Sequence, residues 1–197
     1  MSPRAAAALL FPALACAATP GPSPDVAASR SPSRGTHAAI RSRPTPRAPD
    51  EPAASRDRET GALVGITAAH NAVRKGVGVG PLVWSSELAA HAQEWADHLA
   101  ASGCNLQHRP PGGDAFGENI FWSSGGATPA SVVAEWTAER SGYDHAKNRC
   151  RGVCGHYTQV VWRRSERLGC GVARCDGAEL WVCNYDPPGN FVGESPY

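Results

Sequence analysis

Two histidines and two glutamates in the second half of the chain have the chemistry of a metal or proton-transfer site. They are His108, Glu118, Glu139 and His156. Imidazole nitrogens and carboxylate oxygens both ligate divalent ions such as zinc. Spacing alone favours the plainer interpretation, four solvated side chains, because exposed histidines and glutamates are common on loops and Glu135 competes with Glu139 for one helix face. The elements that would position the four side chains therefore have to be considered.

Two helices are expected before the first of these residues. In segment 61–75, apolar side chains and one histidine recur at helical spacing and predict a single buried stripe, which consists of Leu63, Ile66, His70 and Val73. A second helix is expected from about Glu87 to Ser102. Ser85 or Ser86 would cap its beginning, and Gly103 would end it.

A third helix would position Glu139. Thr128 is a suitable N-cap and Pro129 suits the first helical position, so this helix should begin there. Glu139 lies seven residues after Val132 and should project from the core-facing stripe. A carboxylate in that place is costly unless it is paired or ligates an ion.

After the helices the pattern changes to short strands. They are expected at about 156–162, 168–174 and 179–185, with long glycine-rich loops at 103–127 and 141–155. His156 would then lie at the start of the first strand. Because helices precede strands and no internal repeat is present, the order indicates the α+β class.

One disulfide follows from hairpin geometry. Asp176-Gly177 is a favoured dipeptide for a two-residue turn, so opposed residues in the flanking strands have numbers that sum to 353. Cys170 and Cys183 fulfil this condition, at a non-hydrogen-bonded position where their Cα atoms approach closely. We therefore predict the pair Cys170–Cys183.

The other cysteines fit an oxidising compartment. Seven are present, of which Cys16 lies near the start and six lie between residues 104 and 183, and six cysteines allow 15 pairings. Cys175 is an odd number of residues from Cys170 and points to the other sheet face. If Cys150 and Cys154 close a small loop, Cys104 remains for Cys175.

The first 60 residues indicate export and then a linker. Residues 1–18 combine an early positive charge, a short apolar run and small residues, which is typical of an export signal. Residues 19–60 are rich in Pro, Ser, Ala and Arg without any aromatic side chain and predict a disordered stalk. No transmembrane segment is expected. The sequence around Cys16 also faintly resembles a lipoprotein processing site, so a secreted chain and one anchored through Cys16 are alternatives.

The distribution of charge argues against nucleic acid as a partner of the domain. Residues 1–60 contain eight basic and five acidic side chains, whereas residues 61–197 contain eleven basic and thirteen acidic ones. The domain is therefore slightly acidic, and binding of nucleic acid is not expected.

Four motifs occur in order along the chain: HNAVR at 70–74, GENI at 117–120, GHYTQVVW at 155–162 and VCNYDPPGN at 182–190. Together they resemble the CAP superfamily of cysteine-rich secretory proteins, antigen 5 and pathogenesis-related class 1 proteins, and the plant pathogenesis-related type most closely. Their order and spacing match over residues 61–197. The resemblance implies a three-layer α-β-α sandwich with a central antiparallel sheet, stapled by disulfides.

The resemblance also assigns roles to residues. It makes His108, Glu118, Glu139 and His156 a cavity tetrad, with Glu139 selected by the pattern Trp-x-x-Glu at Trp136, and so favours a site over solvated side chains. The family's usual disulfides are similar to the three pairs above, and a metal site formed by the Cys150 and Cys154 thiols with His156 is the alternative. The residues of the first motif are expected to be structural, through internal hydrogen bonds: His70, Asn71 and Arg74.

By the same resemblance we expect a secreted, non-enzymatic module with a defence or host-interaction role. It would bind a sterol or other lipid, and a divalent metal such as zinc in the His/Glu cavity, with no cofactor required. Two alternatives are a zinc-dependent hydrolase or protease using the same cavity, with Glu118 or Glu139 as general base, and a recognition module whose tetrad is only a polar cluster. The final segment Pro187–Tyr197 resembles a released signalling peptide; docking of Phe191, Val192 and Tyr197 on the sheet is the favoured alternative.

Overall fold

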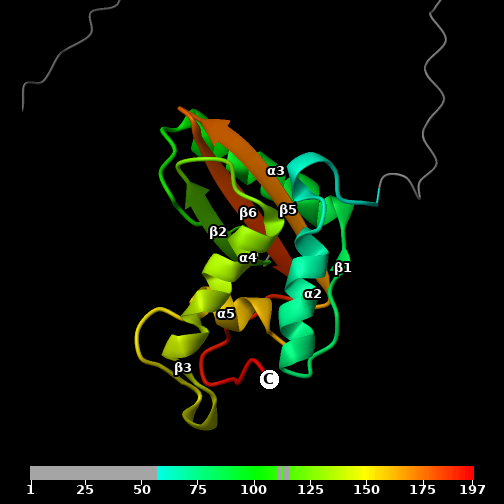
Figure 1. Ribbon diagram of the computed structural model, residues 1–197, viewed down its shortest axis with the longest axis vertical. Coiled ribbons are helices and arrows are strands. Elements are labelled where there is room, and N and C mark those ends of the chain that lie inside the picture. The colour runs from blue at the N-terminus through cyan, green and yellow to red at the C-terminus, as the bar shows by residue number, and fades with distance from the viewer. Residues whose placement is uncertain (1–56, 111, 113–115) are drawn as a thin grey trace, which may run out of the picture. The chain divides into compact units, whose positions relative to one another are not determined.

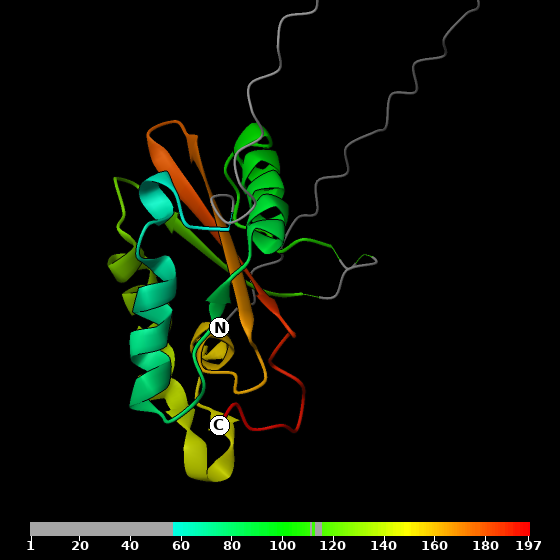
Figure 2. The same cartoon turned by 90° about the vertical axis from the view of Figure 1, so that its right-hand side faces the viewer.

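The computed structural model describes residues 57–110, 112 and 116–197. In that part of the chain a four-stranded sheet has helices on both faces (Figures 1 and 2). The expected α+β class and three-layer α-β-α arrangement are confirmed. Export signal, Cys16 and stalk lie outside the described residues, apart from the last four stalk positions. Among the helices that are described, none has the length and apolar character of a membrane span.

The sheet has the strand order β1-β5-β6-β2. Strands β5, β6 and β2 pair antiparallel, as expected, whereas the short β1 pairs parallel with β5. The strand bounds are Val83–Trp84 for β1, Gly117–Ser123 for β2, Arg167–Cys175 for β5 and Ala178–Asp186 for β6. The expected strands at 168–174 and 179–185 are therefore confirmed.

The β5–β6 hairpin forms where its turn dipeptide predicts it. Asp176 and Gly177 both have positive φ, 47° and 85°, as a two-residue turn of this kind requires. The resulting register places Cys170 opposite Cys183, and the two are disulfide-bonded. The local turn therefore determines both the register and the first disulfide.

The two remaining cysteine pairings are also confirmed. Cys104 is bonded to Cys175, and Cys150 to Cys154. The alternative metal site that used the thiols of Cys150 and Cys154 is wrong, because their sulfur atoms are joined to each other. Cys104–Cys175 links the loop after α3 to the end of β5, and so ties one helix layer to the sheet.

Of the described helices, α3, Ser86–Ala101, is the one that covers one of the two faces of the sheet (Figure 2). Its N-cap is Ser85, whose hydroxyl accepts a hydrogen bond from Leu88 N, so the expected helix and cap are confirmed. Two glycines of β5 allow the close approach. A Cβ on Gly169 would lie 2.1 Å from Ala89 N, and one on Gly171 would lie 2.4 Å from Gln93 Cα.

The opposite face is covered by α2, Ile66–Gly76, α4, Pro129–Ala138, and α5, Gly155–Val160 (Figures 1 and 2). Helix α4 begins at the expected cap, Thr128, whose side chain accepts from Ser131 N. The core on this side is made of buried apolar side chains from all three helices and the sheet, among them Ile66, Val132, Trp136, Tyr157, Val160 and Trp181.

The first expected helix is divided into two parts. A 3₁₀ turn, Gly61–Leu63 (η1), precedes α2, and Gly65 between them has a φ of 100°, which interrupts the helix. The Glu59 carboxylate accepts hydrogen bonds from Gly65 N and Thr67 N at the start of α2. Glu59 was expected in the stalk, and these contacts place it against the domain.

The expected strand at 156–162 is wrong, because this segment forms α5 and the turn after it. Every residue from Tyr157 to Trp162 is buried. The alternating pattern of this segment therefore does not reflect one buried and one exposed face of a strand. The Glu139 carboxylate accepts hydrogen bonds from His156 N and Tyr157 N, two of the N–H groups in the first turn that have no partner within the helix. This distant cap stabilises a helix in a sequence of strand-forming residues.

The two expected loops contain strands. Segment 103–127 includes β2, whose backbone groups pair with β6 over the seven residues Gly117–Ser123. Segment 141–155 includes a small hairpin of β3, Tyr143–Asp144, and β4, Arg149–Cys150. Two 3₁₀ turns, Glu139–Gly142 (η2) and His145–Lys147 (η3), flank β3.

Candidate functional site

Glu139 and His156 form one half of the candidate site. Helix α4 ends at Ala138, so Glu139 is its C-cap and begins η2, rather than lying on the helix as expected. Its Oε1 lies 2.7 Å from the ring Nδ1 of His156, and its Oε2 accepts from the His156 main-chain N at 2.9 Å. Glu135 is exposed. Of the two glutamates that could occupy this site, Glu139 is the one that contacts His156.

The His156 ring is fixed on a second side by Trp136. The two rings are stacked, with centroids 6.4 Å apart and an interplanar angle of 15°. Trp136 is in turn held by a hydrogen bond from its Nε1 to Ile120 O in β2. The imidazole is therefore oriented by a carboxylate and by an indole that both belong to the α4 region.

His108 and Glu118 form the other half of the site. The His108 Nδ1 lies 2.7 Å from Glu118 Oε1, which also accepts from Arg109 N. This hydrogen bond raises the pKa of His108, with partial burial acting in the opposite direction. Glu118 Oε2 is buried and has no hydrogen-bond partner in the described part of the chain. Of the four carboxylate oxygens in the two pairs, it is the one that is buried and accepts no hydrogen bond from the described residues.

Strand β2 carries Glu118 of one half and contacts the other half through Asn119. Glu118 and Asn119 are consecutive, so their side chains leave β2 on opposite sides. Asn119 Nδ2 donates to the main-chain oxygen of His156 and to the Tyr185 hydroxyl, both at 3.1 Å. Sequence reasoning missed this role of Asn119, although it directly follows the glutamate in the motif GENI. Asn119 thereby connects β2 to the start of α5.

The four side chains occur as two His–Glu pairs. In residues 57–110, 112 and 116–197, no three or more His, Cys, Asp or Glu side chains lie together as a metal-binding group. Each Nδ1 faces its carboxylate, which leaves the two Nε2 atoms as the remaining ring donors. A carboxylate behind an imidazole is the usual partner of a metal-bound histidine. Each pair thus has the chemistry of a metal-ligating imidazole with a carboxylate behind it, but the four side chains do not form one metal-binding group in the described part of the chain.

The residues of the motif HNAVR have structural hydrogen bonds, as expected. His70 Nδ1 donates to Ile66 O at 2.8 Å, which leaves Nε2 to accept from the Tyr185 hydroxyl at 2.8 Å. Burial lowers the pKa of His70 to about 4, so the ring is neutral near pH 7. Arg74 donates only to main-chain oxygens, those of Gly80, Val160, Trp162 and Ser165.

Asn71 completes this structural group. Its side chain donates to Leu82 O at 2.9 Å and accepts from Leu82 N at 2.7 Å, which fixes the segment that leads into β1. Burial lowers the pKa of Arg74 to about 10. In the described part of the chain, none of the three side chains of this motif is hydrogen-bonded to a residue of the His–Glu pairs. They position α5 and β1, and through them the site.

The tail Pro187–Tyr197 docks on α5 and η3. Asn190 accepts from Thr158 Oγ1 at 2.7 Å and donates to Gly155 O, while the Tyr197 ring stacks on His145 with centroids 4.4 Å apart. Docking of Tyr197 was expected, but on the sheet rather than on these elements. The expected docking of Val192 is wrong, because this side chain is fully exposed. Phe191 is half exposed and packs against Trp162, with centroids 6.1 Å apart, rather than on the sheet.

Comparison with known proteins identifies the family. The model of the CAP family, described as the cysteine-rich secretory protein family, matches residues 67–185. Pathogenesis-related protein 1 from Arabidopsis thaliana is 49% identical over 129 residues, which cover 65% of this chain and 78% of that protein. Pathogenesis-related protein 1C from Nicotiana tabacum is 50% identical over 133 residues, covering 66% and 77%.

Two solved structures have the same fold. The venom allergen-like protein 4 of Schistosoma mansoni is 29% identical, with a TM-score of 0.59 over 71% of this chain and 95% of that one. The crystal structure of NaASP2 with Zn²⁺ is 26% identical, with a TM-score of 0.58 over 72% and 87%. With the family model matching most of the folded domain, this chain belongs to the CAP family of cysteine-rich secretory proteins.

Proposed function

We propose that this chain is an exported, non-enzymatic binding module with a defence-type role. Its domain takes up a sterol or another lipid and holds a divalent ion such as zinc through the His–Glu pairs. The defence role is supported by the pathogenesis-related names of relatives about half identical in sequence. Intact-mass measurement of the exported protein distinguishes a chain that starts in the stalk from one that starts with a lipid-modified Cys16.

The orientation of the two imidazoles is the observation that supports metal binding. His108 and His156 each have Nδ1 at 2.7 Å from a carboxylate, so each Nε2 is free to ligate. Glu118 and Glu139 would orient the rings and balance the positive charge of the ion. A bound zinc ion would supply a Lewis acid and an activated water. A similar chain, NaASP2, has a crystal structure with Zn²⁺.

Isothermal titration with zinc tests this half of the proposal. The His156→Ala variant should lose zinc binding, whereas His98→Ala, which removes an exposed histidine of α3, should bind as the wild type does. Equal zinc affinity of wild type and His156→Ala would contradict the site. Absence of any zinc binding would leave the tetrad as a polar cluster of a recognition module.

Lipid binding is supported by membership of the family and is tested separately. Purified protein is titrated with a fluorescent sterol and with a fatty acid, beside a protein known to bind each. Uptake of either by wild type and by His156→Ala would support a lipid site that does not depend on the metal. If neither ligand binds while the reference proteins do, the lipid half of the proposal is wrong.

The metal-dependent hydrolase is the second candidate, and the unpartnered Glu118 Oε2 is the observation in its favour. A buried carboxylate oxygen beside a metal-binding imidazole could accept a proton from an attacking water. All six described cysteines are in disulfides, and no described serine hydrogen-bonds to His108 or His156. Metal-dependent cleavage that His156→Ala abolishes would support the hydrolase. Cleavage that survives the change would indicate a contaminant.

A further inference from the structure

Positive charge is concentrated at one end of the domain. Residues 140–164 contain six basic and one acidic side chain, whereas the rest of segment 57–197 contains six basic and fourteen acidic ones. All six basic side chains are exposed: Arg140, Lys147, Arg149, Arg151, Arg163 and Arg164. An asymmetry of this size in a nearly neutral protein produces a local positive potential that favours an anionic partner.

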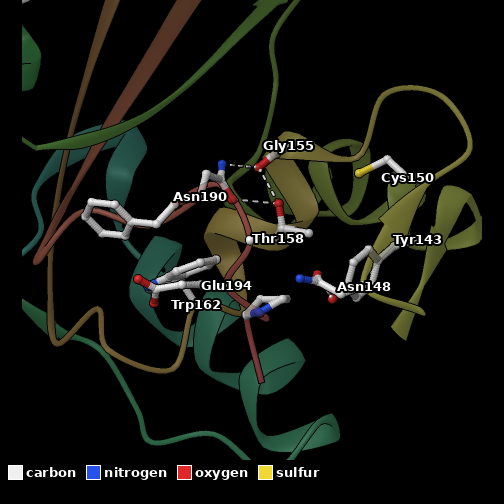
Figure 3. Close-up of a pocket in the computed structure, with 11 residues that line it drawn as sticks. Tyr143, Asn148, Cys150, Gly155, Thr158, Trp162, Asn190 and Glu194 are labelled. Atoms are coloured by element: carbon white, nitrogen blue, oxygen red, sulfur yellow. Dashed lines mark hydrogen bonds between the residues drawn. The ribbon is translucent and has the colours of Figure 1, made fainter. Parts of the chain in front are cut away.

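A hollow of about 270 Å³ lies at this end, between α5, the β3–β4 hairpin and the tail (Figure 3). Its walls include the aromatic side chains of Tyr143, Trp162 and Phe191. A second hollow of about 290 Å³ shares Trp162 with the first and is lined by Arg163 and Arg164. The two hollows together form one surface that is aromatic inside and basic at the rim.

The arginines and Asn148 supply the donors of this surface. Trp162 is 2% exposed and its Nε1 is buried, so the indole lines the hollow without offering a donor to a ligand. The Asn148 amide nitrogen points into the hollow (Figure 3), while its oxygen is occupied by the Tyr143 hydroxyl at 2.8 Å. Glu194 also lines both hollows, but it pairs with Arg164. A ligand here would therefore be rich in acceptor oxygens.

We propose that this surface binds an acidic polysaccharide, a chain of uronate sugars. The apolar faces of sugar rings pack on aromatic side chains, the hydroxyl oxygens accept from the Asn148 amide, and the carboxylates pair with the exposed arginines of this end of the domain. The concave shape favours a chain of rings over a bilayer, because a flat headgroup surface cannot enter the hollow. None of the residues belongs to the His–Glu pairs, so the site is independent of the proposed metal.

Titration of the full chain with polygalacturonate fragments tests the proposal. The matched ligand is the same polymer with its carboxylates reduced to alcohols, which should bind much more weakly. Arg149→Gln with Arg163→Gln removes two exposed charges at this end of the domain, of which Arg163 lines the second hollow, and should weaken binding by about three- to tenfold. Arg58→Gln with Lys75→Gln removes two exposed charges elsewhere, since Arg58 precedes η1 and Lys75 lies on α2, and should leave binding unchanged.

Phe191→Leu tests the hollow itself, because it keeps an apolar side chain and removes an exposed aromatic wall. It should weaken binding of the intact polymer, and if it does not fold the rim variants still decide. Equal binding of the intact and the reduced polymer overturns the proposal. An equal loss of binding in both double variants also overturns it, because such a loss would point to the basic stalk or to net charge alone. Binding of phosphatidylglycerol vesicles with the same dependence on Arg149 and Arg163, but not of polygalacturonate, overturns it in favour of a membrane.

Discussion

Glu139 accepts two hydrogen bonds from His156, one from the main-chain N–H and one from the ring Nδ1. The first helps to cap α5, and the second fixes the orientation of the imidazole. A carboxylate at a helix N-terminus also interacts favourably with the helix dipole. The side chain that orients a candidate ligand is therefore also one that stabilises the helix on which that ligand lies.

Glu139→Gln should destabilise the fold by about 1–2 kcal/mol, because an amide keeps only one acceptor for the three N–H groups that face the carboxylate. The matched control is Glu135→Gln, an exposed position on the preceding helix α4, which should change stability by less than about 0.5 kcal/mol. Urea denaturation measures both. Equal effects of the two changes would show that the cap contributes nothing.

The sequence predicts those features of the fold that depend on neighbouring residues. The Asp176-Gly177 turn determines the hairpin register, and Ser85 and Thr128 mark the beginnings of two helices, because turn and cap chemistry acts over a few residues. The pair Cys170–Cys183 follows from the same register. These predictions need no knowledge of the rest of the chain.

Features that depend on distant partners could not be predicted in this way. Helix α5 has a strand-like sequence, and its helical form depends on Glu139 and on burial from all sides. Strand β2 follows from its pairing with β6. The tetrad residues were chosen through family resemblance, and their division into His108–Glu118 and His156–Glu139 is a tertiary property that spacing does not contain.

Zinc binding should weaken as the pH falls, because only neutral imidazole ligates and protons compete for the rings. Glu118 raises the pKa of His108, so the weakening should begin above the ordinary histidine pKa. Glu118→Gln removes this effect and should move the midpoint to lower pH. Titrations between pH 5 and about 8 give the midpoint. A zinc affinity that does not vary across this range would rule out the site.

His70 should make the fold less stable in mild acid. Burial lowers its pKa from 6.5 to about 4 in the folded state. Below pH 6.5 the unfolded chain therefore binds a proton that the folded chain does not, and stability falls until about pH 4, by at most about 3 kcal/mol. His70→Gln should flatten this slope, whereas His98→Gln, at an exposed position, should retain it. Denaturation at a series of pH values measures the slope, and an unchanged slope in His70→Gln would contradict the assignment.

Gly171→Ala should destabilise the fold by about 3 kcal/mol, because the new Cβ would lie 2.4 Å from the backbone of Gln93 in α3. The control is Gly76→Ala at the end of α2, where a Cβ meets no atom within 4 Å. That change should be neutral or stabilising by about 0.5 kcal/mol, since alanine is the better helix former. Thermal denaturation compares the two. A tolerated alanine at 171 would show that the helix and sheet can separate without loss of stability.

The tail should remain attached when the folded protein meets proteases. Pro187 is exposed, so the junction is accessible, but Tyr197 is held by the Tyr157 hydroxyl at 2.9 Å and by the stacked ring of His145. Tyr197→Ala removes both contacts and should increase release of the tail by about fivefold, because cleavage follows the population of the locally open state. Val192→Ala, at a fully exposed position of the same tail, should behave as the wild type. The rate of tail release is measured by incubation with extracellular fluid of the host and mass spectrometry of a fragment beginning at Pro187. If the wild-type tail is released as fast as the stalk is trimmed, the signalling-peptide alternative is favoured.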